Sequence, residues 1–309
     1  MTGGVLIPLL QTVVTSATPL LFAALGELVA ERSGVLNLGV EGMMLAGAVF
    51  GFAVMTATGS DTLALLAAAA AGTTLALLFG VLALTLAASQ VATGLALTIF
   101  GTGLSTLIGA RYTGRTVPPL PRLDVPGLSE LPVIGPLLFR YDAMVYLSVA
   151  SAFAIGWFLR RTRGGMVLRA VGESDVSAHS IGHPVIRIRY LAVLFGGAMA
   201  GLGGAYLSLA YTPLWAEQMT AGRGWIALAL VVFAAWRPGR ALMGAYLFGG
   251  ITVLQLYLQG SGLVAIPTQI LAMVPYIATI VVLTVISSAS ARSRLSAPAC
   301  LGKTFRVAT

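Results

Sequence analysis

Long apolar runs separated by short polar segments cover most of the chain. A helix that crosses the hydrocarbon core of a bilayer, about 30 Å thick, needs roughly 20 apolar residues. The sequence predicts about nine such runs, and eight or ten would follow from modest changes at their boundaries. They lie at residues 5–25, 42–59, 62–87, 91–110, 142–159, 190–211, 224–236, 241–260 and 266–287. The seventh run is short, which indicates a half-helix or a tilted segment buried in protein.

The composition agrees with this pattern. Hydrophobic residues make up 58% of the 309 residues and charged residues only 9%, whereas soluble domains carry about 25% charged residues. We therefore expect an all-α protein, a polytopic bundle of transmembrane helices in a lipid bilayer. In such a protein the net charge of +8 marks one side of the membrane and contacts anionic lipids, and it predicts no nucleic-acid partner.

Arginine residues set the expected orientation. Six arginines lie in segment 160–189, and further basic residues follow residue 287. Because basic residues concentrate on the cytoplasmic side of membrane proteins, both segments are predicted to be cytoplasmic. Alternation through nine spans then places residues 26–41, 88–90 and 237–240 on the same side and the N-terminus outside.

This organisation predicts one transmembrane domain, residues 1–287, and a basic cytoplasmic tail, residues 288–309. Segment 160–189 is the large cytoplasmic loop. The outer loop, residues 111–141, contains six of the 14 prolines, so we expect it to be extended or rich in turns. It is either a docking surface for an external partner or a plain connector.

Several kinds of chemistry are missing from the sequence. It contains no GxxxxGK[ST] phosphate-binding loop and no HExxH zinc motif. Gly182 and Pro184 interrupt the helix that would align His179 with His183, so no metal site is predicted there. The apolar runs also lack the series of buried acids and bases expected of a proton-coupled pump. We expect a protein that is not an enzyme and that takes its energy from elsewhere.

The first polar motif lies at residues 26–48 and includes Asn37 and Glu41. A charge at the centre of a bilayer costs at least about 2.5–3.5 kcal/mol, so Glu41 must face water, protein or a cavity. Gly34 and Gly39 would let the backbone bend beside it. One interpretation is a bent entry to the second span that faces the centre of the bundle, and the other is a juxtamembrane loop with solvated acids.

Two further features concern the cytoplasmic loop and the sixth span. In residues 168–182, Ser174 is placed to cap a short helix that ends near Gly182. The sixth span carries two stripes of small residues with a spacing of four, which favours close packing of neighbouring helices. The stripes are Gly196, Ala200 and Gly204, and Gly197, Gly201 and Ala205.

Four stretches together carry a family resemblance. They are 31-ERSGVLNLGVEG-42, 88-ASQVATGLALTIFGTGL-104, 168-LRAVGESDVSAHSIG-182 and 222-GRGWIALALVVFAAWRPGRALMGAYLFGG-250. They resemble the inner-membrane permease subunits of ABC importers for simple sugars and nucleosides. The first stretch is similar to the nucleoside branch, whose binding partner is a lipoprotein of the basic-membrane-protein type. The sugar branch usually shows GxxDLSVG there, and the branched-chain amino acid permeases show GVxNFAxG.

The resemblance implies a fold of the vitamin-B12-importer kind and a set of partners. Two permeases, expected here to be two different chains, would form the path for a small-molecule substrate in the bacterial plasma (inner) membrane, with the C-terminus in the cytoplasm. A separate cytoplasmic ABC ATPase would bind ATP and Mg²⁺, so this chain itself would hold no cofactor. An extracytoplasmic lipoprotein would deliver the substrate.

The resemblance also assigns roles to residues. The cytoplasmic loop would couple to the ATPase through a pattern that reads RAxGENPxAAxxxGI in the family. The matching residues here are Arg169, Ala170, Gly172, Glu173 and Gly182, while Ser174 and Asp175 replace the Asn-Pro pair. The substrate path would include Asn37 and Glu41, with Gln90 and Thr93 as weaker candidates. Asn37 and Glu41 would hydrogen-bond the substrate or hold the bend in shape.

Three alternatives remain open at this point. The first is an ABC permease for simple sugars or branched-chain amino acids. The second is an ion-coupled secondary transporter, which the missing intramembrane ion pairs disfavour. The third is a membrane scaffold without transport activity, against which the polar motif at membrane depth weighs.

Overall fold

The computed structural model describes residues 3–123, 127, 134–261, 267, 270, 273–286 and 297–305. Within these ranges the chain is helical, and the extended segments form only isolated bridges. The elements are α1 (Gly3–Arg32), α2 (Val40–Thr58), α3 (Asp61–Gly80), η1 (Val81–Thr85), α4 (Gln90–Gly109), η2 (Ala110–Tyr112), α5 (Ile134–Leu138), α6 (Ala143–Arg161), α7 (Arg163–Glu173), α8 (Asp175–Ser180), α9 (Val185–Tyr206), η3 (Leu207–Tyr211), α10 (Arg223–Phe233), α11 (Pro238–Ser261) and α13 (Val274–Ile286).

The predicted polytopic helical bundle is confirmed. Seven helices in the described ranges are long and apolar enough to cross a membrane. The seventh predicted run corresponds to α10, which has only 11 residues and is a half-length helix, as the sequence indicated. The ninth predicted run, 266–287, lies partly outside the described residues, and α13 is its described helix. Of the predicted tail, 288–309, only residues 297–305 are described.

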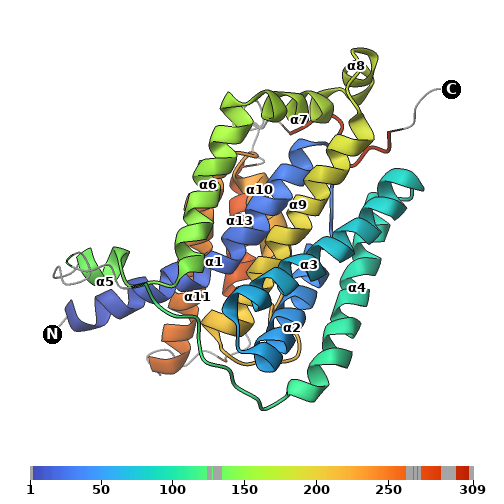
Figure 1. Cartoon of the computed structure of the whole chain (residues 1–309). Helices are drawn as coiled ribbons and strands as arrows, with labels where there is room; N and C mark the ends of the chain where they lie inside the picture. The colour runs from blue at the N-terminus through green and yellow to red at the C-terminus, as the bar shows by residue number, and fades with distance from the viewer. Residues whose placement is uncertain are drawn as a thin grey trace.

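Helix α1 extends well beyond the first predicted span. The sequence placed Glu27 and Glu31 on the inner flank, after a helix ending near residue 25. Instead α1 continues to Arg32, and both carboxylates are 1% exposed. The predicted end of the helix near residue 25 was wrong, because each acid has a buried hydrogen-bond donor from another segment and so lies within the helix, as described below. At its other end α1 runs away from the bundle beside α5 (Figure 1), where the Gln11 amide donates to the Pro136 carbonyl.

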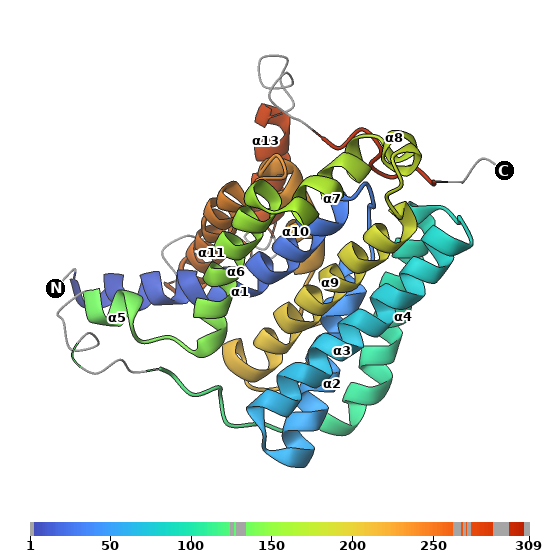
Figure 2. The same ribbon diagram turned by 45° about the horizontal axis from the view of Figure 1, so that its top comes forward.

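Helix α9 packs against α1, α2 and α3 at the centre of the bundle (Figures 1 and 2). The predicted small-residue stripes make these contacts. Gly196 lies against Gly26 of α1, Gly197 lies against Gly72 of α3, and Gly204 lies against the α2 backbone. A Cβ atom at Gly197 or Gly204 would overlap a neighbouring backbone, and one at Gly196 would be a tight contact, so the glycines set how closely the helices approach.

The segments predicted to lie on one side of the membrane meet at one end of the bundle. There the Arg32 guanidinium donates to the Trp236 carbonyl, Gln90 donates to the Lys303 carbonyl, and α7 lies across the end of α1 (Figure 2). We call this the basic end. The outer loop, as far as it is described, lies at the opposite end, where the Val117 amide donates to the Pro213 carbonyl. We call that the loop end.

A single methyl group at Gly72 tests the packing of α3 on α9. The new Cβ would overlap the Gly197 backbone. We therefore expect Gly72→Ala to lower the free energy of unfolding by about 1–3 kcal/mol. Thermal unfolding of the purified protein in detergent measures this change.

Gly103→Ala is the matched control, because Gly103 also lies within a helix but a Cβ there would have no atom of another described segment within 4 Å. Alanine there should be neutral or stabilise the protein by up to about 1 kcal/mol. Equal losses at Gly72 and Gly103 would contradict the packing account.

Candidate translocation and coupling site

The backbone between α1 and α2 folds back into the bundle, and buried polar groups hold it there. Gly34 has φ +91°, a value that favours glycine. The backbone N–H of Asn37 donates to the Glu27 carboxylate at 2.9 Å. The side-chain oxygen of Asn37 accepts from the backbone N–H of Gly39, also at 2.9 Å. Asn37 is only 2% exposed. Asn37 therefore organises the turn before α2.

Glu41 holds the beginning of α10. Its carboxylate accepts from the Thr220 hydroxyl at 2.6 Å, the Gly222 amide at 2.8 Å and the Gly224 amide at 2.6 Å. Gly222 is the N-cap residue of α10 and has φ +78°. The first N–H groups of a helix have no partner within the helix and carry a partial positive charge. Glu41 supplies both the acceptors and the opposite charge.

Helix α10 therefore begins inside the bundle. Its 11 residues correspond to about 16 Å, roughly half the thickness of the bilayer core. From there it runs to the basic end, where Trp236 follows it. A helix that starts at this depth is tolerated only when its free N–H groups are satisfied by protein, and the Glu41 contacts meet that requirement.

Glu31 holds the other end of the same helix. The Trp236 indole N–H donates to the Glu31 carboxylate, and the Trp236 carbonyl accepts from the neighbouring Arg32 guanidinium at 3.1 and 3.2 Å. Trp236 has φ +54° in the turn between α10 and α11. Three buried acids, Glu27, Glu31 and Glu41, thus each stabilise a place where the chain turns or a helix starts.

The weaker path candidates lie beside the same turn. The Gln90 side chain is 2% exposed, accepts from the Leu36 amide at 2.8 Å and donates to the Lys303 carbonyl at 3.3 Å. Thr93 is buried one turn further along α4. The structure therefore brings Asn37 and Gln90 to one connected region with Thr93 nearby. A direct contact of these residues or of Glu41 with substrate stays a prediction.

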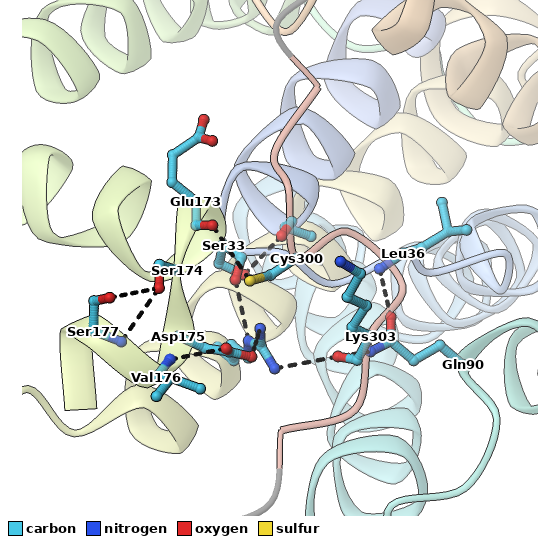
Figure 3. A network of polar contacts seen from close by, with 12 residues as sticks. Ser33, Leu36, Gln90, Glu173, Ser174, Asp175, Val176, Ser177, Cys300 and Lys303 are labelled. Carbon is cyan, nitrogen blue, oxygen red and sulfur yellow. Dashed lines mark hydrogen bonds and ion pairs between the residues drawn. The ribbon is translucent and has the colours of Figure 1, made fainter. Parts of the chain in front are cut away.

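The predicted coupling loop contains two helices instead of one. Thr162 caps α7, which is amphipathic and buries Leu168 and Val171 against the bundle. Ser174 caps α8 by accepting from the Ser177 amide at 3.3 Å, as expected from the sequence (Figure 3). Gly182 has φ +90° after α8. The predicted cap and the predicted stop are therefore both present.

The five predicted coupling residues differ in exposure. Gly172 is buried and its Cβ would overlap the Arg32 carbonyl, while Ala170 and Glu173 are exposed at the basic end. Arg169 is half-buried and Gly182 is exposed. Within segment 160–189 the most exposed large apolar side chains are Val176 (69%) and Ile181 (72%), which were not predicted as coupling residues. Their position within a short capped helix and its following turn was the available signal.

A buried ion pair that was not predicted from the sequence fixes α8 to the bundle. The Arg189 guanidinium contacts the Asp175 carboxylate at 3.0 Å, and Arg189 is 1% exposed. It also donates to the Ser33 carbonyl at 3.1 Å and the Lys303 carbonyl at 3.4 Å. Figure 3 shows Ser33, Asp175 and Lys303 gathered from three segments. Arg189 is a charged residue close to the start of the apolar helix α9, and this position was the sequence signal for a buried partner.

Residues 297–305 form part of this arrangement. The Cys300 amide donates to the Gly172 carbonyl at 2.9 Å, and the Gly302 amide donates to the Gly34 carbonyl at 3.1 Å. Cys300 itself is buried. This stretch therefore connects the coupling loop to the turn after α1.

The loop end contains a cavity of about 580 Å³ with both polar and apolar residues in its lining. Arg122, Arg140, Asp142 and Tyr206 line part of it. Burial raises the pKa of the Asp142 carboxyl, although the carboxyl accepts hydrogen bonds from two backbone amides and from the Tyr206 hydroxyl. The cavity lies beside the outer loop 111–141, whose residues 124–126 and 128–133 are outside the described residues.

Comparison with known proteins identifies this bundle. A family described as the permease component of branched-chain amino acid transport systems matches residues 9–283. The chain belongs to this permease family. It is therefore a multi-pass membrane protein of the ABC permease class, as the sequence motifs indicated.

The relatives of this permease include proteins named for different cargoes. It is 42% identical to a putative glucose ABC transporter permease protein, TsgC13, of Haloferax volcanii, over 96% of this chain and 97% of the relative. It is 35% identical to the guanosine ABC transporter permease protein NupQ of Bacillus subtilis, over 87% and 88%. It is 33% identical to the nucleoside ABC transporter permease protein NupC of Lactococcus lactis, over 86% and 88%.

Removal of the Glu41 carboxylate tests its role at α10. In Glu41→Ala the Thr220 hydroxyl and two backbone amides lose their acceptor, and each buried unpaired group costs about 1–3 kcal/mol. We expect a loss of at least about 3 kcal/mol in stability together with loss of uptake. Glu41→Gln should lose less, because one oxygen remains. Thermal unfolding of the purified protein measures the first effect, and uptake by cells that carry the variant together with its native partners measures the second.

Glu217→Ala is the control, because Glu217 is exposed and, among the described residues, accepts a single 3.3 Å hydrogen bond, from the Thr106 hydroxyl. Its stability should change by less than about 0.5 kcal/mol. If uptake and stability were unchanged in Glu41→Ala, the carboxylate would have no role in holding the path.

Proposed function

We propose that this permease is the membrane-spanning subunit of an ATP-driven importer of nucleosides. The observation that supports the proposal most is the α7–α8 segment, which lies at the basic end of the bundle. The relatives of this chain are named ABC transporter permeases. The nucleoside assignment rests on the ERSGVLNLGVEG stretch and on the two relatives named for guanosine and nucleosides.

The partners follow from the two ends of the bundle. The basic end would face the cytoplasm, because it collects the arginine-rich segments, and α8 would contact a separate ABC ATPase that binds ATP and Mg²⁺. The loop end would face outward and receive a substrate-binding lipoprotein. A second, different permease would complete the path. The membrane would be the bacterial inner membrane.

A continuous series of contacts supports a mechanism of coupling. Asp175 of α8 contacts Arg189, which contacts the Ser33 carbonyl. The segment after Ser33 leads to Asn37 and then to Glu41, which holds α10. Movement of α8 with the ATPase would shift this turn and the half-helix together. The permease pair needs only two stable arrangements, one favoured by the closed ATPase and the other by its release.

Simple sugars are the second candidate cargo. The 42% identity to a putative glucose permease over nearly the full length of both chains favours them. Nucleosides and sugars share hydroxyl groups, so a permease path with few strong contacts would suit either. Selection between them would then rest on the binding lipoprotein, as it would for branched-chain amino acids.

A tagged pull-down from native membranes in mild detergent, read by mass spectrometry, tests the proposal. We expect an ABC ATPase, a second permease and a lipoprotein. The ligand of that lipoprotein, measured by calorimetry with nucleosides, sugars and amino acids, would identify the cargo. Recovery of this chain alone, with uptake that resists ATP depletion but fails when ion gradients collapse, would favour a secondary transporter instead.

Val176, an exposed residue at the start of α8, provides a specific test of ATPase coupling. Val176→Glu places a charge on an apolar side chain that is 69% exposed, so the fold should tolerate it while docking of the ATPase weakens. We expect a loss of assembly of at least about tenfold, since a charge buried in an interface without a partner costs well over 1.4 kcal/mol. Co-purification with the ATPase measures this loss.

Leu138→Glu is the matched control, because Leu138 is 57% exposed and lies in α5 near the loop end. It should leave assembly with the ATPase unchanged. Normal assembly of Val176→Glu, or an equal loss in both variants, would count against α8 as the docking element.

A further inference from the structure

The basic end contains a cavity of about 590 Å³ with a strongly positive lining. Four arginines, Arg32, Arg160, Arg169 and Arg237, line it together with a single acid, Glu173. They come from the ends of α1 and α6, from α7, and from the turn before α11. The fold therefore brings four guanidinium groups from separate segments to one place.

Glu173 balances only part of this charge, because four arginines line the cavity with one acid. The ion pair found among the described residues joins Arg189 to Asp175, which do not line the cavity. Arg32 donates to the Trp236 carbonyl. The Arg169 Nε atom is buried and has no hydrogen-bond partner in the described part of the chain. Gathering like charges and leaving a buried donor unpaired both cost free energy, and an anion in the cavity would offset both costs.

The cavity also has an apolar side, which includes the α6 residues just before Arg160. Gly156 and Leu159 of α6 line it, together with Trp236. On the same helix Phe153 is 68% exposed and Trp157 is 64% exposed. Exposed aromatic residues just before the basic end of a span mark the lipid-facing side at headgroup level. The cavity thus has guanidinium groups at the headgroup level and apolar residues toward the hydrocarbon.

We propose that this cavity binds the phosphate group of an anionic phospholipid from the adjoining membrane leaflet. Arginine binds phosphate through paired, charge-assisted hydrogen bonds, and arginines near a membrane surface attract anionic lipids. The bound lipid would join α7 to the ends of α1 and α6. A carboxylate of a protein partner would suit the charges but would not use the apolar wall that continues toward the lipid-facing side of α6.

Native mass spectrometry of the purified full chain tests this site. The protein is titrated with phosphatidylglycerol, with phosphatidylcholine, and with inorganic phosphate as competitor. The test variant is Arg160→Gln/Arg237→Gln, whose two arginines are exposed and whose loss should not impair folding. We expect phosphatidylglycerol to bind the wild-type protein more tightly than phosphatidylcholine. Affinity should fall about fivefold for each arginine removed, or about 25-fold for both.

The matched control is Arg161→Gln/Arg240→Gln. These arginines are exposed at the same end but do not line the cavity, so binding of phosphatidylglycerol should fall much less. Equal losses in the two variants would show general surface attraction and overturn the proposal. Displacement of the lipid by millimolar phosphate would instead indicate a site for the free anion. Unchanged lipid binding with weaker ATPase assembly would assign the cavity to the ATPase and also overturn the proposal.

The assay needs neither ATP nor cargo. Its failure would therefore leave the proposed transport function untouched, and loss of that function would leave the lipid site open to the same measurement.

Discussion

A helix that begins inside a bilayer presents N–H groups that water cannot reach, and α10 begins this way. The carboxylate of Glu41 accepts from two of these amides and from the Thr220 hydroxyl. Without such acceptors the half-helix would leave unpaired donors at membrane depth, which is the arrangement that bilayers tolerate least. Glu41, a charged residue that costs free energy to bury, is therefore the residue that allows α10 to begin inside the bundle. The interrupted helix in turn begins near the centre of the bundle, against the turn that leads into α2.

The other buried polar groups extend this arrangement toward the basic end. Glu27 holds the turn after α1, Glu31 holds Trp236 at the far end of α10, and Arg189 ties α8 to the same turn. Around them, α1, α2 and α3 pack closely on α9 through glycine contacts. The centre of the bundle is closely packed, and a few polar contacts connect the turn after α1 with the two ends of α10. Such a centre suits a protein with two discrete arrangements, because packed interfaces switch between states and do not deform continuously.

Most of the fold could be predicted from the sequence, because apolar run length and arginine distribution are local signals. The seven helices long enough to span a membrane and the short α10 were found from run length, and the stripes on α9 and the Ser174 cap from local residue patterns, while the ninth predicted run lies partly outside the described residues. The extension of α1 to Arg32 was missed, because the partner of Glu31 is Trp236, more than 200 positions later. The Arg189–Asp175 pair and the packing of residues 297–305 on Gly172 were missed for the same reason. Contacts between distant segments leave no periodic pattern in the sequence. Asn37 and Glu41 could therefore be predicted as buried polar residues, but their hydrogen-bond partners could not.

Hydrogen exchange of the wild-type protein, resolved to residues 218–233, would test the central claim most directly. The first amides of a helix normally exchange fast, because they have no acceptor within the helix. If Glu41 holds the start of α10, the amides of Gly222 and Gly224 should exchange as slowly as those in the middle of the helix. Fast exchange at these two positions, beside a protected helix interior, would show that the carboxylate does not cap α10 and would contradict the account.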